Sequence, residues 1–133
     1  MTKKRYFVTK IAMNIIIKAK NLELANWLKN VIKNKIGGLK KFLKKLKKGQ
    51  DVLFDTFVEV EKETRHHKKG DIFRTEVKIV LFGKDLVAKA HGENLVKTII
   101  DVKKELEMEI QKYKLKVIEL PRRKYRKIKR EIF

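Results

Sequence analysis

One stretch of the chain constrains its fold more than any other, and it runs from Leu24 to Lys48. It contains nine lysines and no acidic residue. Its apolar residues recur at steps of three and four, which places them on one side of a helix with about 3.6 residues per turn. The stretch therefore predicts a basic amphipathic helix whose apolar stripe must be covered by the rest of the chain. The stripe consists of Leu28, Val31, Ile32, Ile36, Leu39, Phe42, Leu43 and Leu46.

Two adjacent glycines, Gly37 and Gly38, interrupt this helical pattern. Each glycine costs about 1 kcal/mol relative to alanine inside a helix, so we expect a bend or a close packing contact there. The side opposite the stripe is cationic, and a rod with charges along most of its length favours a polyanionic partner. The lysines expected on that side are Lys29, Lys33, Lys40, Lys44 and Lys47.

The net charge of the chain is +20, from 36 basic and 16 acidic residues. Most of the surplus lies in three segments: residues 1–12 contribute +4, residues 24–48 contribute +9, and residues 117–133 contribute +5. Concentrated like charge opposes folding through self-repulsion. Its distribution therefore indicates an anionic partner such as nucleic acid or an acidic membrane.

Length and composition predict one globular domain, because 133 residues with 43% hydrophobic content can bury a core. The absence of cysteine excludes disulfides and thiolate metal sites and fits a reducing compartment. Asn14 interrupts the apolar run near the start and no small-residue cleavage site follows, which argues against a signal peptide. No run reaches the roughly 18 apolar residues that span a bilayer, so we expect a cytoplasmic protein.

After Gly49 the apolar period changes from 3.6 to 2, which is typical of half-exposed strands. Residues 53–62 and 72–82 alternate in this way, and residues 13–19 and 86–91 are expected to complete a set of four strands.

A second helix is expected to begin after Asn94 and to run to about Leu115. Pro121 and the basic residues after it predict an extended tail, because proline lacks an N–H donor and the charges repel one another. Trp27 and the phenylalanines are interpreted as lying on apolar stripes and are expected in the core rather than as base-stacking platforms.

The order β-α-β-β-β-α predicts an α+β two-layer sandwich, with a four-stranded sheet and two helices on one face. We expect a basic N-terminal arm over residues 1–12, the α+β domain over residues 13–116, and a basic C-terminal tail over residues 117–133. The αβββα portion has the topology of double-stranded RNA-binding domains.

Three segments carry a family resemblance: MNIIIKAKNLELANWLKNVIKNKIGGLKKFL from Met13, ETRHHKKGDIFRTEVKIVLFGKDLVAKAHGENL from Glu63, and the helix that begins at Val96 and ends in QKYK. Together they resemble the ribosome hibernation-promoting factor family, also called ribosome-associated inhibitor A or ribosomal subunit interface protein, over residues 13–116. The chain is similar to the short type, which lacks a separate dimerisation domain. The resemblance implies the same fold, binding to rRNA of the small ribosomal subunit in the mRNA and tRNA channel, and silencing of translation under stress or in stationary phase.

The resemblance also implies RNA contacts, because basic positions of the family's helices fall on Lys29, Lys35, Lys41 and Lys112. Other positions depart from the family pattern. Its usual basic residues in the second helix fall on Glu105 and Met108, and its usual aromatic residue falls on Val96. Neighbouring lysines and the basic tail are expected to compensate. The RNA-binding set that we predict is Lys29, Lys33, Lys35, Lys40, Lys41, Lys44, Lys47, Lys103, Lys104, Lys112, Arg122 and Arg123.

Two other classes of function compete with this hypothesis. A basic amphipathic helix can also bind a membrane surface or a groove on a protein partner. A small metalloenzyme is the third class, suggested by Glu63, Asp71, His91 and the adjacent His66 and His67, although neighbouring histidines in a polar loop are usually only solvated. No glycine-rich phosphate loop or nucleophile constellation is present. We therefore expect no enzymatic activity, cofactor, metal, membrane or small-molecule substrate.

Overall fold

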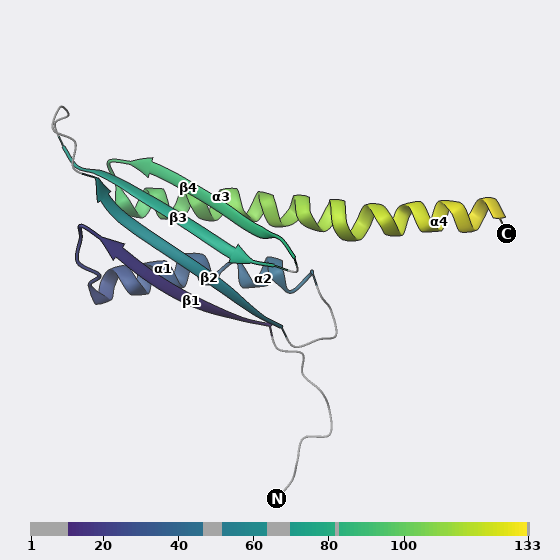
Figure 1. Cartoon of the computed structure of the whole chain (residues 1–133), viewed down its shortest axis with the longest axis horizontal. Coiled ribbons are helices and arrows are strands. Elements are labelled where there is room, and N and C mark those ends of the chain that lie inside the picture. Colours follow the sequence, from purple (N-terminus) through teal and green to yellow (C-terminus); the bar gives the residue numbers. More distant parts are fainter. Residues whose placement is uncertain (1–10, 47–51, 64–69, 82, 133) are drawn as a thin grey trace, which may run out of the picture.

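The computed structural model describes residues 11–46, 52–63, 70–81 and 83–132. They form a four-stranded sheet, two helices that follow the first strand, and a long C-terminal rod (Figure 1). Most of the predicted N-terminal arm, together with Lys47, His66 and His67, lies outside the described residues. The elements are β1 (Ile11–Lys20), α1 (Asn26–Gly37), α2 (Lys40–Leu43), β2 (Val52–Glu63), β3 (Ile72–Val80), β4 (Asp85–Gly92), α3 (Leu95–Tyr113), the π-helical turn η1 (Lys114–Glu119) and α4 (Leu120–Ile132).

The sheet is mixed, and its strands lie in chain order β1-β2-β3-β4. β1 and β2 are parallel because the chain crosses over through α1 and α2 between them, whereas β2, β3 and β4 form an antiparallel meander. One cross-strand row joins Ile17, Val58, Val77 and Ala88. This row belongs to the face that packs against the helices.

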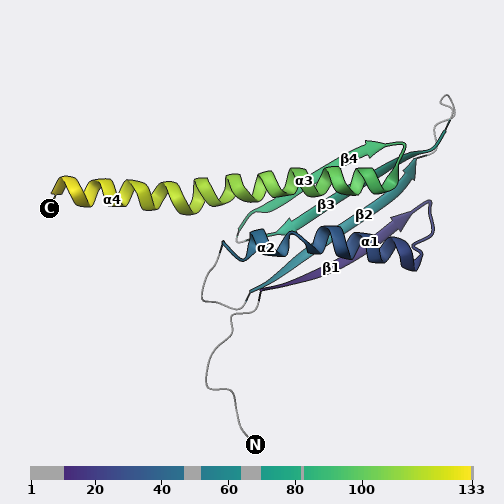
Figure 2. The ribbon, with the colours of Figure 1, turned by 180° about the vertical axis from the view of Figure 1, so that it is seen from behind.

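The helices cover a single face of the sheet, which Figure 2 shows from the helical side. Alternation along each strand sends every second side chain into the core, as its period of 2 requires. The predicted four-stranded two-layer sandwich is therefore confirmed. The buried apolar residues are Leu28, Ile32, Ile36, Leu39, Leu43, Leu46, Phe54, Val58, Val60, Val77, Ile79, Leu81, Leu86, Ala88, Ile99, Val102, Leu106, Ile110 and Tyr113.

The bend predicted at the glycine pair is present, because α1 ends at Gly37 and α2 begins only at Lys40. The Gly38 N–H donates to the Asn34 carbonyl at 3.2 Å, and the Leu39 N–H donates to the Ile36 carbonyl at 3.0 Å. This tight turn redirects the chain while Ile36 and Leu39 both stay fully buried. The apolar stripe therefore continues across the bend.

The extended tail predicted after Pro121 is wrong, because α3, η1 and α4 form one continuous helical rod that projects beyond the sheet (Figure 1). Pro121 is the second residue of α4, and only Leu120 separates it from the end of the wider π-helical turn at Glu119. There the Leu120 N–H donates to the Leu115 carbonyl, five residues back. A wider turn accommodates the proline ring and its missing donor without ending the helix. No residue of α4 is buried.

Two aromatic residues expected in the core lie on the surface. Trp27 is 57% exposed and Phe57 is 41% exposed. Trp27 precedes the buried Leu28 and is therefore rotated by about 100° from it around α1. Phe57 alternates with two buried neighbours on β2, so it lies on the face of the sheet that the helices leave uncovered, which we call the open face. There the Lys78 Nζ atom lies 5.2 Å from the centroid of the Phe57 ring. Phe54, by contrast, is buried as expected.

Buried hydroxyl groups link the sheet to α3. Thr98 donates its Oγ1 proton to the Leu95 carbonyl at 2.6 Å, and the Thr75 and Thr98 Oγ1 atoms lie 2.8 Å apart. Because Thr98 has only one hydroxyl proton, Thr75 is the donor between them. Thr56 is also fully buried, but its Oγ1 atom has no hydrogen-bond partner among the described residues.

Candidate nucleic-acid interface

The helices α1 and α2 present an exposed cationic surface that contains no acidic residue. Of the lysines predicted there, Lys35 is half-buried and Lys47 is outside the described residues. The others carry no ion pair within the described part of the chain, so their charges face solvent. These exposed lysines, which we call the lysine face, are Lys29, Lys33, Lys40, Lys41 and Lys44.

The α3 helix adds a cation to the edge of this lysine face. The Lys103 Nζ atom lies 3.1 Å from the position that a Cβ atom on Gly38 would occupy. Lys103 also lies 3.9 Å from the Glu107 carboxylate on its own helix and is only 24% exposed. The glycine at the bend therefore makes room for the Lys103 side chain between the two helices. Lys104, its neighbour, is exposed.

The remaining predicted RNA-binding residues lie farther along the C-terminal rod. Lys112 pairs with Glu109 at 3.6 Å, and Arg123 pairs with Glu119 at 3.7 Å. Arg122 is fully on the surface of α4. The structure therefore brings Lys103 next to the α1 and α2 lysines, whereas Arg122 and Arg123 lie on the part of the rod that extends past the sheet (Figure 2).

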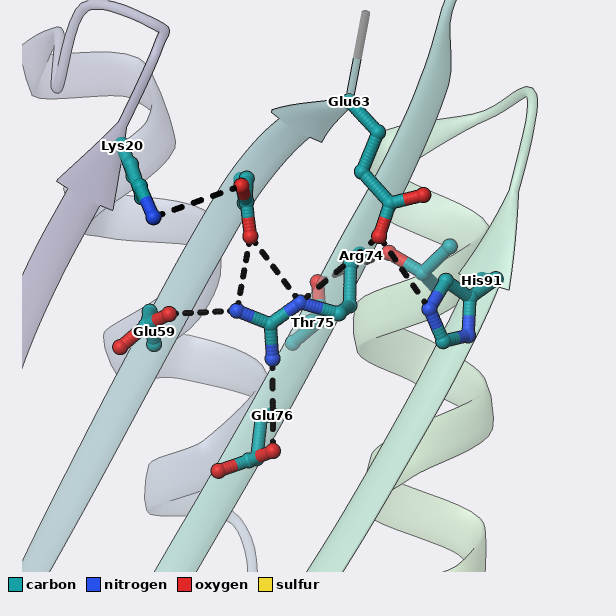
Figure 3. Close-up of polar contacts among 9 residues, drawn as sticks. Lys20, Glu59, Glu63, Arg74, Thr75, Glu76 and His91 are labelled. Atoms are coloured by element: carbon teal, nitrogen blue, oxygen red, sulfur yellow. Dashed lines mark hydrogen bonds and ion pairs between the residues drawn. The ribbon is translucent and has the colours of Figure 1, made fainter. Parts of the chain in front are cut away.

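The open face of the sheet has a different electrostatic character, because four glutamates gather there around Arg74 (Figure 3). Glu59 and Glu76 are direct cross-strand partners, an arrangement in which two like charges repel. Arg74 contacts both of these carboxylates and donates to the Glu61 carboxylate at 3.1 Å from Nε and at 2.8 Å from Nη2. Glu63 lies 3.3 Å from the His91 Nε2 atom. One guanidinium thus holds this cluster together.

The Arg74 side chain lowers the pKa of Glu61, chiefly through its hydrogen bonds and with further help from the charge of Lys20. The same contacts raise the pKa of Arg74. Glu61 therefore stays ionised to a lower pH than an ordinary glutamate, which keeps negative charge on the open sheet face. The acid-free helices on the opposite side make the better surface for a polyanion.

A hollow of about 510 Å³ lies where the turn after β1, the start of α1, the end of β2, the start of β3 and the start of α3 meet. Sequence reasoning missed this feature because it assigned Trp27 to the core. The available signal was the position of Trp27 beside the stripe rather than on it. Val96 lines the same hollow as Trp27. The residues that line the hollow are Asn21, Leu22, Glu23, Trp27, Leu28, Lys62, Phe73, Asn94, Leu95 and Val96.

Within the described ranges, no three histidine, cysteine, aspartate or glutamate side chains come together as metal ligands would. None of the described helices combines the length and apolar character needed to cross a bilayer.

The fold and the lysine face define a basic α+β protein with one surface suited to a polyanion. The chain matches the sequence profile of the family described as "Sigma 54 modulation protein / S30EA ribosomal protein" over residues 15–118, and it belongs to this family. The family resemblance inferred from the sequence is thereby confirmed.

Solved structures that share the fold include two from other organisms. One is the Protein Y N-terminal domain of Thermus thermophilus, with a TM-score of 0.56 and 14% identity, covering 80% of this chain and 99% of that one. The other is a ribosomal subunit interface protein from Coxiella burnetii, with a TM-score of 0.50 and 14% identity, covering 79% of this chain and 99% of that one. A search of curated proteins gave no match to the chain.

Proposed function

We propose that this protein is a translation-silencing factor that binds rRNA of the small ribosomal subunit and occupies the channel that mRNA and tRNA require. The observation that carries the proposal is the lysine face, an acid-free cationic surface on α1 and α2 in a chain of net charge +20. Membership of the S30EA ribosomal protein family supports a ribosomal partner. So does the fold shared with a protein named as a ribosomal subunit interface protein.

The proposed mechanism is occlusion without chemistry. Lysine ammonium groups neutralise rRNA phosphates and release their counterions, which supplies affinity that depends on salt but little on sequence. The two-layer body then fills the space into which mRNA and tRNA must enter. A protein that works in this way acts stoichiometrically and needs no cofactor. We propose that it acts in the cytoplasm, under stress or in stationary phase.

Binding to a membrane surface through the amphipathic stretch from Leu24 to Lys48 would require its apolar stripe to enter the lipid. Its central residues Leu28, Ile32 and Ile36 are fully buried against the sheet and α3. Inserting them into a membrane would require the helix to leave the core. The lysine face alone remains available, and it fits a polyanion that is bound through phosphates.

Two measurements test the proposed function. In a sucrose gradient of separated subunits, the protein should cosediment with the small subunit, and added salt should release it. In a cell-free translation reaction, inhibition should scale with the fraction of ribosomes occupied. Progressive silencing of excess ribosomes by substoichiometric protein would indicate catalysis and overturn the occlusion mechanism.

A further inference from the structure

The hollow beside α1 has the walls of a binding site for a flat aromatic ligand. Trp27 presents 57% of its surface, although large aromatic residues are usually mostly covered. Phe73 adds a second aromatic wall from β3, and Leu22 and Val96 add aliphatic ones. Its volume of about 510 Å³ is in the range of small-molecule sites and is sufficient for a nucleobase.

Polar groups at the rim could recognise the edge of such a ligand. Asn94 caps α3 by accepting a hydrogen bond from the Lys97 backbone N–H at 3.2 Å through its Oδ1 atom. Its amide nitrogen is therefore left with two N–H groups to donate elsewhere. Asn21 is exposed and held in the left-handed region, with φ of 59°. Side-chain amides at these two positions match the donors and acceptors along the edge of a base.

Cationic side chains lie at the hollow and beside it. Lys62 lines it directly and pairs with Asp71 at 3.4 Å, and the exposed Lys97 follows Val96 on α3. Glu23 is the single acidic residue among the walls. The lysine face begins at Lys29, so a nucleic-acid backbone bound along α1 would reach the hollow at the start of that helix. An uncharged apolar side chain from a protein would make no use of these lysines.

We propose that the hollow binds an unpaired nucleobase of single-stranded RNA, stacked on Trp27, while neighbouring lysines hold the flanking phosphates. This inference rests on the proposed function in taking RNA as the partner, and it adds a site for unpaired nucleotides to the phosphate-binding lysine face. Stacking on an aromatic side chain tolerates any base, because each base has a π-face. The site would therefore recognise an unpaired strand rather than a sequence.

Trp27 is the only tryptophan in the chain, so its fluorescence reports directly on the hollow. The wild-type protein is titrated with hexauridylate and hexaadenylate, with an RNA duplex of equal charge, and with inorganic polyphosphate, which has charge but no bases. Both hexanucleotides should quench Trp27 emission, whereas polyphosphate and duplex should bind with little quenching. Equal quenching by polyphosphate, or none by either hexanucleotide, would overturn the base site.

Variants separate stacking from charge. Affinity for a labelled hexanucleotide, measured by anisotropy, should fall roughly tenfold in Trp27→Ala and recover largely in Trp27→Phe, which keeps an aromatic face. Because Trp27 is mostly exposed, the thermal transition should be retained in both variants. Unchanged affinity in Trp27→Ala would overturn the proposal. A second result would also overturn it: Trp27 emission shifts to the blue when the protein binds small subunits, while free RNA causes no quenching. That combination would indicate that an apolar protein side chain occupies the hollow.

The two proposals can fail separately. If wild-type protein and Trp27→Ala cosediment equally with small subunits and neither hexanucleotide quenches, the base site is wrong while the ribosomal function stands. If the wild-type protein does not follow the small subunit at all, the proposed function is wrong, whatever the hexanucleotides show.

Discussion

The Lys103 Nζ atom lies 3.1 Å from the point at which a Cβ atom on Gly38 would stand. This closeness joins a cation of α3 to the lysines of α1 and α2 across the bend between those two helices. A residue that looks in the sequence like a helix breaker therefore also determines how close the cationic side chains of two helices can come.

The first prediction follows from that contact. Gly38→Ala should preserve the fold, because Gly38 has ordinary helical dihedral angles of −63° and −16°, but the Lys103 ammonium must move away. Affinity for small subunits should fall modestly in Gly38→Ala and in Lys103→Gln. The double variant should lose less than the sum of the two, because both changes affect the same charge. Full additivity in binding isotherms would show that Gly38 does not position Lys103.

The Arg74 cluster leads to a prediction about pH. Arg74→Met leaves Glu59 and Glu76 opposite each other without a cation between them, so the Tm at pH 7 should fall by several degrees. The pKa of Glu61 is lowered in the folded protein, so its contribution is present above its ordinary pKa of 4.5 and is lost as the pH falls through the folded value. The difference in Tm between wild type and variant should therefore shrink below about pH 4.5. A constant difference between pH 7 and pH 3 would contradict this account.

A pair of isosteric substitutions tests the buried hydroxyls. Thr56→Val replaces a hydroxyl that has no partner among the described residues, so it should stabilise the protein by about 1 kcal/mol. Thr75→Val is the matched control, because it removes a hydroxyl that donates to Thr98 and should destabilise by about 1 kcal/mol. Chemical denaturation of both variants gives the two signs. Destabilisation by Thr56→Val would mean that its hydroxyl is satisfied.

The C-terminal rod can be shortened without touching the core. Ile118 packs against the core, whereas no residue of α4 is buried, so a chain that ends at Glu119 should still unfold cooperatively. It should bind small subunits more weakly, because α4 carries Arg122, Arg123 and five further basic residues. Loss of the thermal transition on truncation would place α4 within the folding unit.

Patterns that depend on local periodicity were predictable from the sequence. Alternation along β2 and β3 correctly placed Val58 and Val77 inside, and the 3.6 period correctly placed Ile32 in the core and Lys33 outside. The bend at Gly37 and Gly38 was equally predictable, since glycine carries a known helical cost. The four-stranded two-layer sandwich was predictable as well, because one face of a sheet can bury the apolar stripes of both helices at once.

Features that depend on tertiary placement were not predictable. The Arg74 cluster requires the cross-strand register, which sets Glu61 opposite Arg74 and Glu59 opposite Glu76. Trp27 lies one position from the stripe, so its exposure depends on where α1 begins and what covers that end. The helical course through Pro121 was missed because a wider turn absorbs the proline ring, and no local sequence rule indicates such a turn.

The central claim is that the lysine face binds rRNA phosphates, and the salt dependence of binding to lipid-free small subunits tests it most directly. The quadruple variant with Lys29, Lys33, Lys40 and Lys44 changed to Gln should keep its circular dichroism spectrum. Since each phosphate contact contributes roughly 0.7 to 0.9 log units to the salt slope, the loss of four contacts should lower that slope by about 3.

The matched control changes Lys18, Lys20, Lys84 and Lys89 to Gln, which removes the same charge from exposed positions outside the helices. It should retain nearly the wild-type salt slope for binding to small subunits. The account predicts a flattened slope for the lysine-face variant alone. An unchanged slope and affinity in that variant, or an equal loss in the control, would contradict the assignment of the interface to α1 and α2.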